Sequence, residues 1–394
     1  MKWLLSIGAV LAAAGAARAQ AEYEFILVEA FSLNYGLREC YLWDINDQGL
    51  ACGTSTREYQ VPNGTSITYS GLTWTAATEK VPLDAMTWPR GVNNAGLVVG
   101  GNLVFDLGAG AALATIPTPP GGYPGVSAAD INDSGVVVGT VLTCNCSNSS
   151  GLNQFPWVWD AVSGVREVLV PGAKDLRRIN SAGVAAGVIR YGAGMPDGYT
   201  YDTSTGAYTV LSSRLPQPPS GQTIWLMARD INAAGVVTGE YRQDDLFRDG
   251  FIWSEASGFT FFDGIGGASN VDVHPQGIND AGVVVGYAGY DPNLSGTHHA
   301  FVWDALRGTR DLNALAQGVP AGFILDRALE VNEQGWIIGD GHYGPNWGSS
   351  RAWVLRPLSP APACYANCDD STAAPVLNVA DFTCFLGRFA AGCP

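Results

Sequence analysis

Three carboxylates lie close enough in the sequence to act together in catalysis. They are Asp244, Asp245 and Asp249. A pair of carboxylates can hydrolyse a glycosidic bond, with one acting as the general acid and the other as base or nucleophile. A solvated acidic loop has the same composition. We expect the solvated loop here and keep glycoside hydrolysis as the alternative.

The histidines and tryptophans are the next candidates for chemistry. None of the four histidines stands in a recognisable catalytic frame, and the chain has no Gly-x-Ser-x-Gly elbow, His-Glu-x-x-His helix or phosphate-binding glycine loop. We expect these histidines on the surface and assign no catalytic residue. Loop tryptophans could stack on sugar rings, with core packing as the competing role. The histidines are His274, His298, His299 and His342, and the tryptophans are Trp88, Trp225 and Trp347.

Eight cysteines give the chain an even number of thiols. Cys40 and Cys52 each lie six residues from Asn46, so a disulfide across that hairpin is one interpretation and two separate thiols are the other. The Cys144-Asn-Cys146 pair is a weak metal signal because no further ligand lies nearby, and we expect a loop disulfide there.

The elements that position these residues are set by a ten-residue motif, seen most clearly in Gly277-Ile-Asn-Asp-Ala-Gly-Val-Val-Val-Gly286. Seven copies are spaced by 39 to 53 residues, which in a β-rich chain is typical of propeller blades. Asn, Asp and Gly are the residues that tight hairpins require, so we interpret the motif as a turn rather than a ring of calcium or ligand sites. The motif asparagines are Asn46, Asn93, Asn132, Asn180, Asn232, Asn279 and Asn332.

Each repeat continues into an aromatic third strand such as Ala300-Phe-Val-Trp303, in which large side chains alternate and can fill the space between blades. The seventh repeat meets proline after Leu355 and lacks a fourth strand. The segment Glu24–Ala30 precedes the first motif where a fourth strand would lie. We therefore predict an all-β, seven-bladed β-propeller over residues 22–357, closed by its N-terminal strand.

The overall composition supports the all-β class and argues against nucleic acid and anionic lipid surfaces as partners. Fifty glycines and only 14% charged residues are typical of a turn-rich β protein. The net charge of −15 repels phosphate backbones and anionic lipid surfaces, so nucleic acid is not an expected partner.

The first residues indicate export. Lys2, an apolar run from Trp3 to Ala17 and the site Ala17-Arg18-Ala19 are typical of a signal peptide, which we assign to residues 1–19. No later stretch approaches about 18 uninterrupted apolar residues, so no membrane span is predicted. We expect a secreted protein, extracellular or associated with the cell surface.

The C-terminal end is predicted to be a separate unit. Residues 358–363 read as a stiff Pro-rich linker, and residues 364–394 hold four of the eight cysteines. Val379, Phe382 and Phe389 share one face of a predicted helix that ends at Gly392. A small disulfide-rich helical module is therefore expected.

Two family resemblances follow from these motifs. The repeated Ile-Asn-x-x-Gly-x-Val-Val-Gly motif with its Trp-Asp strand resembles the HAF-type extracellular repeats of secreted bacterial proteins, which implies location and shape but no general activity. The tail from Cys364 to Phe382 looks like a dockerin-type, EF-hand-like module. That resemblance implies calcium as a cofactor of the tail and a cohesin-like or cell-surface anchoring partner. The implied calcium ligands are Asn367, Asp369, Ser371, Asn378 and Asp381.

For that loop the residues alone leave two interpretations open, a calcium site or a disulfide-stapled mini-helix that binds nothing. The function that we predict is a secreted, non-catalytic binding or scaffolding propeller, which presents loops to a glycan or protein ligand and is anchored through its tail. The alternative is an extracellular carbohydrate-active enzyme, a glycoside hydrolase or lyase on the same scaffold.

Overall fold

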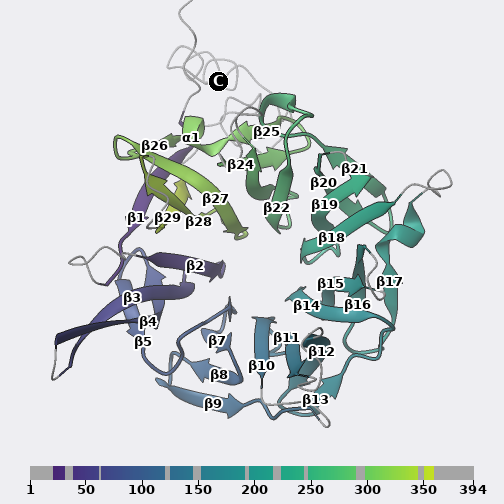
Figure 1. Ribbon diagram of the computed structural model, residues 1–394, viewed down its shortest axis with the longest axis horizontal. Coiled ribbons are helices and arrows are strands. Elements are labelled where there is room, and N and C mark those ends of the chain that lie inside the picture. Colours follow the sequence, from purple (N-terminus) through teal and green to yellow (C-terminus); the bar gives the residue numbers. More distant parts are fainter. Residues whose placement is uncertain are drawn as a thin grey trace, which may run out of the picture.

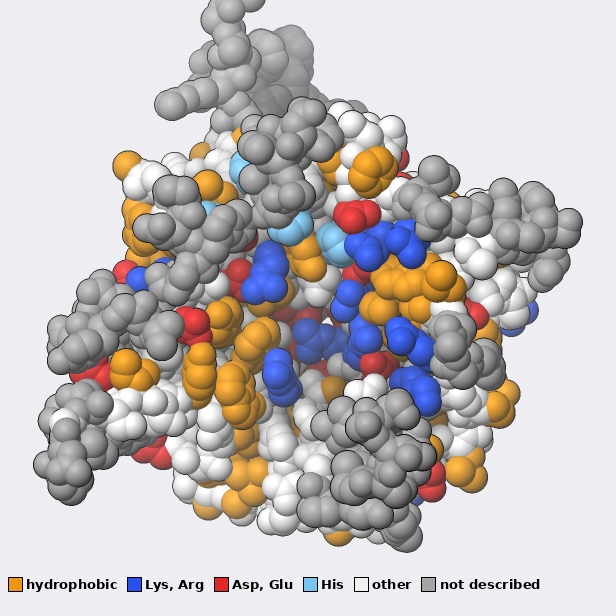
Figure 2. Space-filling view, viewed as in Figure 1, with side chains coloured by type: hydrophobic (Ala, Val, Ile, Leu, Met, Phe, Trp, Pro, Cys, Tyr) orange, Lys and Arg blue, Asp and Glu red, His pale blue; other side chains and the backbone are white. Residues whose placement is uncertain are grey.

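The computed structural model describes residues 21–31, 39–61, 64–119, 125–144, 152–190, 195–215, 223–243, 247–289, 298–344 and 350–358. Across these ranges the strands form seven sheets arranged in a circle around a central channel (Figure 1). Viewed along that channel, the molecular surface is hollowed at its centre (Figure 2). The predicted seven-bladed β-propeller is confirmed.

Six of the blades are four-stranded antiparallel sheets built from consecutive strands. Blades 1 to 3 contain β2 (Cys40–Ile45), β3 (Ala51–Val61), β4 (Gly64–Thr75) and β5 (Glu79–Leu83); β6 (Gly91–Val92), β7 (Leu97–Gly100), β8 (Leu103–Asp106) and β9 (Ala111–Thr115); β10 (Val126–Ile131), β11 (Val137–Cys144), β12 (Leu152–Asp160) and β13 (Gly164–Glu167). Blades 4 to 6 contain β14 (Ala173–Ile179), β15 (Val184–Arg190), β16 (Pro196–Asp202) and β17 (Tyr208–Val210); β18 (Ile224–Ile231), β19 (Val237–Gln243), β20 (Asp249–Ser254) and β21 (Gly258–Phe262); β22 (Val273–Ile278), β23 (Val284–Gly289), β24 (His298–Asp304) and β25 (Gly308–Asp311).

The seventh blade joins the two ends of the propeller. It consists of β27 (Phe323–Val331), β28 (Ile337–Tyr343), β29 (Arg351–Pro357) and β1 (Tyr23–Val28), with β26 (Ala316–Gln317) at its outer edge. β1 pairs antiparallel with β29 over its whole length, so the N-terminal strand closes the ring as predicted. The described helices are short: η1 (Leu211–Arg214), η2 (Ile265–Gly267) and α1 (Leu312–Leu315).

Each motif turn is organised by its asparagine. In blade 6 the Oδ1 atom of Asn279 accepts a hydrogen bond from the backbone N–H of Val283 at 3.0 Å, and Gly282 has a φ of 74°. Glycine adopts that left-handed conformation at little cost, which explains its place in the motif. The turn role predicted for these asparagines is confirmed.

The same asparagines also bind the blades to one another, which the sequence did not indicate. Each side-chain Nδ2 donates to the backbone carbonyl of the motif asparagine in the next blade, and all seven are buried. The ring is closed because the last blade returns to the first. The donor–acceptor pairs are Asn46–Asn93 (2.9 Å), Asn93–Asn132 (3.1 Å), Asn132–Asn180 (3.0 Å), Asn180–Asn232 (2.9 Å), Asn232–Asn279 (3.0 Å), Asn279–Asn332 (3.2 Å) and Asn332–Asn46 (2.8 Å).

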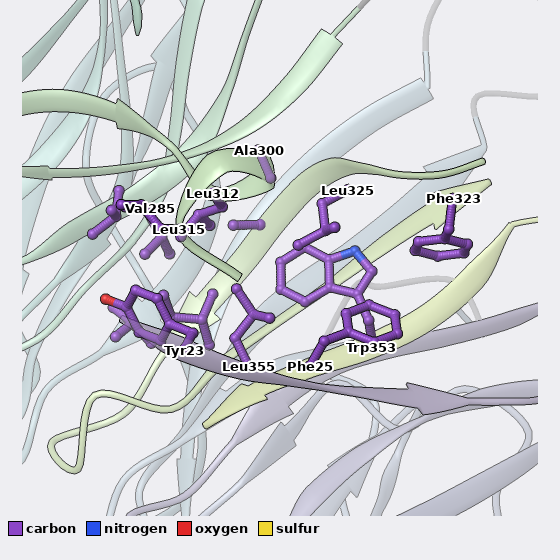
Figure 3. Packing of buried hydrophobic residues seen from close by; sticks show 14 residues of the cluster. Tyr23, Phe25, Val285, Ala300, Leu312, Leu315, Phe323, Leu325, Trp353 and Leu355 are labelled. Carbon is purple, nitrogen blue, oxygen red and sulfur yellow. The ribbon is translucent and has the colours of Figure 1, made fainter. Parts of the chain in front are cut away.

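The hydrophobic cores lie between neighbouring blades, as the alternating aromatics predicted. Figure 3 shows the core between blades 6 and 7, where Trp353 of the third strand is fully buried against Leu325 and Leu355. Phe25 of the closing strand lies 5.4 Å from the Phe323 ring, measured between centroids. The N-terminal strand therefore contributes side chains to the core as well as backbone hydrogen bonds.

Of the two interpretations left open for Cys40 and Cys52, two separate thiols is the one that the structure shows. Cys40 and Cys52 are both buried free thiols. In the ladder Cys40 pairs with Ser55 and Cys52 with Asp44, and the two side chains enter different hydrophobic cores. The bulge at Trp43 does not bring the two thiols onto one face. The expected Cys144–Cys146 pair and the predicted C-terminal module lie outside the residues whose side chains are described.

Candidate ligand site at the mouth of the central channel

The inner strand of a blade carries a β-bulge just before the motif. In β18, for example, Ala228 pairs with Gly239 and Asp230 with Thr238, so Arg229 has no partner in the ladder. A bulge of this kind re-aims the side chain of the extra residue. Six blades have one at the same place, with Trp43, Ala129, Arg177, Arg229, Gln276 and Leu329 as the extra residues.

These six side chains converge on one end of the channel. Together with Arg90, which precedes the short β6 of blade 2, they line a cavity of about 400 Å³. We call this cavity the upper mouth. Figure 2 shows Lys and Arg side chains gathered around the central hollow, in a protein whose net charge is −15. The upper mouth is therefore a cationic site on an acidic protein.

Arg90 is the most available cation of the upper mouth. Its guanidinium carbon lies 4.5 Å from the centroid of the Trp43 ring, and Trp43 in turn stacks on Tyr41 at 5.4 Å. Among the described residues no carboxylate lies within ion-pair distance of Arg90. Burial lowers its pKa, but an arginine remains charged at neutral pH. The tryptophan ring holds the guanidinium plane, and within the described residues no hydrogen bond occupies the guanidinium N–H groups, which can therefore face a ligand.

Two further arginines of the upper mouth, Arg177 and Arg229, are partly neutralised. Arg177 donates from Nε to Asp175 Oδ2 at 3.0 Å, and Arg229 donates from Nε to Glu240 Oε1 at 2.8 Å. Glu240 is only 1% exposed, and although burial would raise its pKa, the close approach of His274 Nδ1 and the charge of Arg229 lower it. Glu240 therefore stays ionised and fixes the side chain of Arg229.

Blade 3 leaves room between these arginines. Its bulged residue is Ala129, and the neighbouring lining side chains are Ser127 and Thr140. All three are small. The cavity consequently extends over blade 3, with Arg90 of blade 2 on one side and Arg177 of blade 4 on the other.

A buried ion cluster closes the channel beneath the upper mouth. Arg178 lies 2.6 Å from Glu330 Oε2 and 3.9 Å from carboxylate oxygens of both Asp44 and Asp230. Burial raises the pKa of these carboxyls and that of Asp130, the latter to about 7. Burial by itself would lower the pKa of Arg178, but Glu330 and the three aspartates raise it overall.

The carboxylates of this cluster also bind the backbone of the next blade. Asp130 accepts from the N–H of Ile179 at 2.9 Å, and Asp230 accepts from the N–H of Ile278 at 2.8 Å. Gly277 makes room for this packing, since a Cβ atom there would lie 2.4 Å from Glu330 Oε1. The cluster is thus part of the scaffold that joins the inner strands.

The opposite end of the channel is acidic. A cavity of about 270 Å³ there is lined by the motif turns, and Arg178 lines both this lower cavity and the upper mouth. Arg178 therefore lies at the boundary between the two. The carboxylates that follow the motif asparagines at this end are Asp47, Asp133, Asp280 and Glu333.

Few of the residues singled out from the sequence meet at the upper mouth. Asp244, Asp245 and Trp347 lie outside the described residues, and Asp249 is partly buried in β20. Trp88 is 42% exposed beside Tyr69. The predicted calcium ligands Asn367, Asp369, Ser371, Asn378 and Asp381 also lie outside the described residues. Within the part of the chain that is described, no group of three or more His, Cys, Asp and Glu is arranged to hold a metal ion.

The histidines differ from the surface positions expected for them. His342 is 5% exposed, and its Nδ1 hydrogen-bonds Asp326, whose pKa burial raises to about 6. His274 stacks on Tyr287 with ring centroids 4.6 Å apart, and its Nδ1 lies 3.3 Å from Glu240. The expectation of exposed histidines is therefore wrong for His342 and His274. Both sit on strands, where packing and carboxylate partners surround them.

The mouth arginines were missed although the sequence carries a signal for them. Arg90, Arg177 and Arg229 each lie three residues before a motif asparagine, in a column that also contains Trp43. Aligned repeats would have shown one variable column rich in arginine. The bulge that turns this column into the channel has no comparable signature, because the same residue types also suit a regular strand.

Comparisons with known proteins support the fold and no finer identity. No protein-family model matches the chain, and no curated protein is similar to it in sequence. Solved structures do match. An oligogalacturonate lyase in complex with manganese aligns with a TM-score of 0.51 and 10% identity over 86% of this chain and 99% of the lyase. The β-propeller domain of the trilobed protease from Pyrococcus furiosus aligns at 0.37 and 12% over 82% and 86% of the two chains.

A sialidase from Trypanosoma rangeli aligns with a TM-score of 0.35 and 11% identity, over 81% of this chain and 54% of the sialidase. At 10% identity the likeness to the lyase shows a shared fold alone. Among the described residues, no helix has the length and apolar content of a membrane span.

Proposed function

We propose that this protein is a secreted, non-catalytic binding propeller that captures an acidic sugar of an extracellular glycan at its upper mouth. Secretion is inferred from residues 1–19, and the binding role from the upper mouth. The observation that carries the proposal is Arg90, a guanidinium without a carboxylate partner among the described residues, held over Trp43 at the edge of a cavity.

The chemistry of the upper mouth favours a planar anion. A guanidinium presents paired N–H donors in a rigid plane, which match a carboxylate or a sulfate. Arg90 and Arg177 flank the space over Ala129, so an anion seated there lies between two cations. Because the site is partly withdrawn from water, each charge-assisted hydrogen bond there contributes about 1.5–3 kcal/mol.

The remaining lining suits the hydroxyl groups of a sugar. Ser127, Thr140 and Gln276 offer hydroxyl and amide groups around the same cavity. Such groups can donate or accept, as sugar hydroxyls do. The combination of guanidinium and neutral polar groups fits an acidic monosaccharide unit better than a simple inorganic anion.

The charge distribution argues against a nucleic acid. The chain carries −15 overall, and the carboxylates around Arg178 lie directly below the upper mouth. A nucleic acid carries a negative charge at every phosphate, so its backbone would be repelled by the negative potential of the protein along its whole length. A short acidic oligosaccharide brings only a few charges near the protein and avoids most of that repulsion.

The tail completes the proposed function. We propose that residues 364–394 form the dockerin-like module and that Asn367, Asp369, Ser371, Asn378 and Asp381 bind calcium, so that the propeller is anchored to a cohesin-like or cell-surface partner. Calcium titration of the full chain and of the Asp369→Ala variant tests this. Equal calcium binding by the two proteins, or none by either, contradicts it.

Titration calorimetry tests binding at the upper mouth. The ligands are a mannuronate tetrasaccharide, a sulfated galactan tetrasaccharide and neutral cellotetraose. We expect one of the acidic ligands to bind, and Arg90→Met to weaken it by about tenfold to a hundredfold. Arg166, exposed and paired with Asp160, provides the matched control Arg166→Met, which should bind as the wild type does.

The same samples test the enzymatic alternative. If the protein shortens or cleaves an acidic ligand during incubation, the non-catalytic role is wrong and a carbohydrate-active enzyme takes its place. If neither acidic ligand binds, or if Arg90→Met and Arg166→Met weaken binding equally, the assignment of the upper mouth is wrong.

A further inference from the structure

We infer that blade 5 carries a second subsite for an acidic group, centred on Arg242, and that the ligand of the upper mouth is therefore an acidic oligosaccharide rather than a single sugar. This inference rests on the proposed function, because it extends the same ligand outward from the upper mouth. It depends on three features of β18 and β19.

The first feature is the position of Arg242. It pairs across the ladder with Trp225, so the two side chains project from the same face of the sheet. On β18 the partly exposed side chains alternate with buried ones and include Trp225, Met227 and Arg229. Arg242 consequently lies on the face of blade 5 that also carries the mouth residue Arg229.

The second feature is the lack of a counter-charge for Arg242. No carboxylate among the described residues lies within ion-pair distance of its guanidinium, and its Nε atom is buried without a hydrogen-bond partner. A buried donor left without a partner costs about 1–3 kcal/mol. Neighbouring Arg248 differs, because its Nη1 lies 3.0 Å from Asp272 Oδ2. A bound anion would supply the counter-charge that the described residues do not give to Arg242.

The third feature is an aromatic side chain beside this cation. The guanidinium of Arg248 lies 5.1 Å from the centroid of the Trp225 ring, and Arg242 is opposite Trp225 in the ladder. Trp225 is only partly buried. Blade 5 thus repeats the pairing of tryptophan and arginine found at Trp43 and Arg90.

The second subsite is continuous with the upper mouth. Arg229 is held by Glu240 of β19. Arg242 lies two residues after Glu240 on the same strand, which separates the two positions by about 7 Å. One carboxylate does not span that separation, whereas acidic groups on successive units of an oligosaccharide do. The ligand class that fits both subsites is a glycan with several acidic units, carrying either uronate or sulfate groups.

The test compares ligand length across three variants, one of them a control. Mannuronate and the sulfated galactan are each titrated as mono-, di- and tetrasaccharides into the full-length protein, Arg90→Met, Arg242→Met and Arg166→Met. We expect wild-type affinity to rise with length by about tenfold for the preferred series, the contribution of one charged contact. Arg242→Met should remove that rise and leave the affinity for the monosaccharide unchanged, whereas Arg90→Met should weaken every length.

The outcomes separate the two proposals. If Arg242→Met binds every length as the wild type does, or if wild-type affinity does not depend on length, the second subsite is wrong while binding at the upper mouth stands. If no acidic ligand of either series binds the wild type, both proposals are wrong. The circular dichroism and thermal midpoint of Arg242→Met should match the wild type, since Arg242 forms no ion pair with any described carboxylate. A variant that unfolds contradicts its assignment as an unpaired cation.

Discussion

The side-chain amide of Asn332 donates a hydrogen bond to the backbone carbonyl of Asn46 at 2.8 Å, although 286 residues separate them in the sequence. This contact closes a ring of seven such bonds around the lower end of the channel. The Oδ1 atom of Asn332 also accepts from the N–H groups of Gln334 and Trp336. One side chain thus shapes its own turn and joins the last blade to the first.

The ring of asparagine side chains predicts that a single substitution within it strongly lowers the free energy of unfolding. Asn332→Ala removes these three hydrogen bonds in a buried site, and we expect it to lower the free energy of unfolding by about 3 kcal/mol. Urea unfolding measures the loss. Asn102→Ala, at an exposed asparagine, is the matched control and should change stability by less than about 0.5 kcal/mol. Equal effects of the two substitutions would contradict a structural role for the ring.

Part of this architecture could be predicted from the sequence. The turn signature Asn-x-x-Gly and the alternating aromatics are local patterns, so the blades and their number followed from them. The missing fourth strand of the last repeat indicated a closing strand at Glu24–Ala30, and the observed strand is Tyr23–Val28. The amide ring could not be predicted in that way. It depends on how neighbouring blades pack, and an asparagine that only formed a turn would look the same in the sequence.

The candidate site was harder to predict than the fold. Arg90, Arg177 and Arg229 stand far apart in the chain and become neighbours only because each inner strand ends at the channel. The bulge leaves Arg229 without a partner in the ladder, which the local sequence does not indicate. Residues that are contiguous in the chain, such as Asp244 and Asp245, give a clearer signal in the sequence, but these two lie outside the described residues.

The closing strand gives a second prediction about stability. Phe25 packs against Phe323 in the core between blades 6 and 7 and is 9% exposed. Phe25→Ala should therefore cost about 3–5 kcal/mol of unfolding free energy. The exposed Phe155→Ala, in β12, serves as control. A neutral result for Phe25→Ala would mean that β1 does not complete the seventh blade.

The buried ion cluster predicts a pH dependence. In the folded protein the pKa of Asp130 is raised from 3.8 to about 7 by burial. Between these values the folded state binds the proton more tightly than the unfolded state, so this group favours folding less and less as the pH rises from about 4 to about 7. Asp130→Asn removes that dependence.

We therefore expect the stability of Asp130→Asn, relative to that of the wild type, to increase as the pH rises through this range. Unfolding free energies of both proteins, measured at several pH values from about 4 to about 7, check the sign. The unfolding free energy of Asp130→Asn minus that of the wild type should rise with pH. A value that stays constant, or that falls as the pH rises, would contradict the raised pKa.

The thiols of blade 1 give a chemical prediction. Burial raises the pKa of Cys40 to about 12, and Cys52 is equally inaccessible. Because the thiolate is the reactive form, neither residue should react with iodoacetamide in the folded protein, and both should react after denaturation without a reducing agent. Peptide mass spectrometry reads out both states. A Cys40–Cys52 disulfide in the denatured sample would show that the two thiols are not free.

The most direct measurement of the central claim is a crystal structure of the full chain with a bound acidic tetrasaccharide, the one preferred in calorimetry. Our account predicts that an acidic group of the sugar accepts hydrogen bonds from the Arg90 guanidinium inside the upper mouth, above Arg178. Density for the sugar at the lower cavity, or on the outer strands with the upper mouth holding only water, would contradict it.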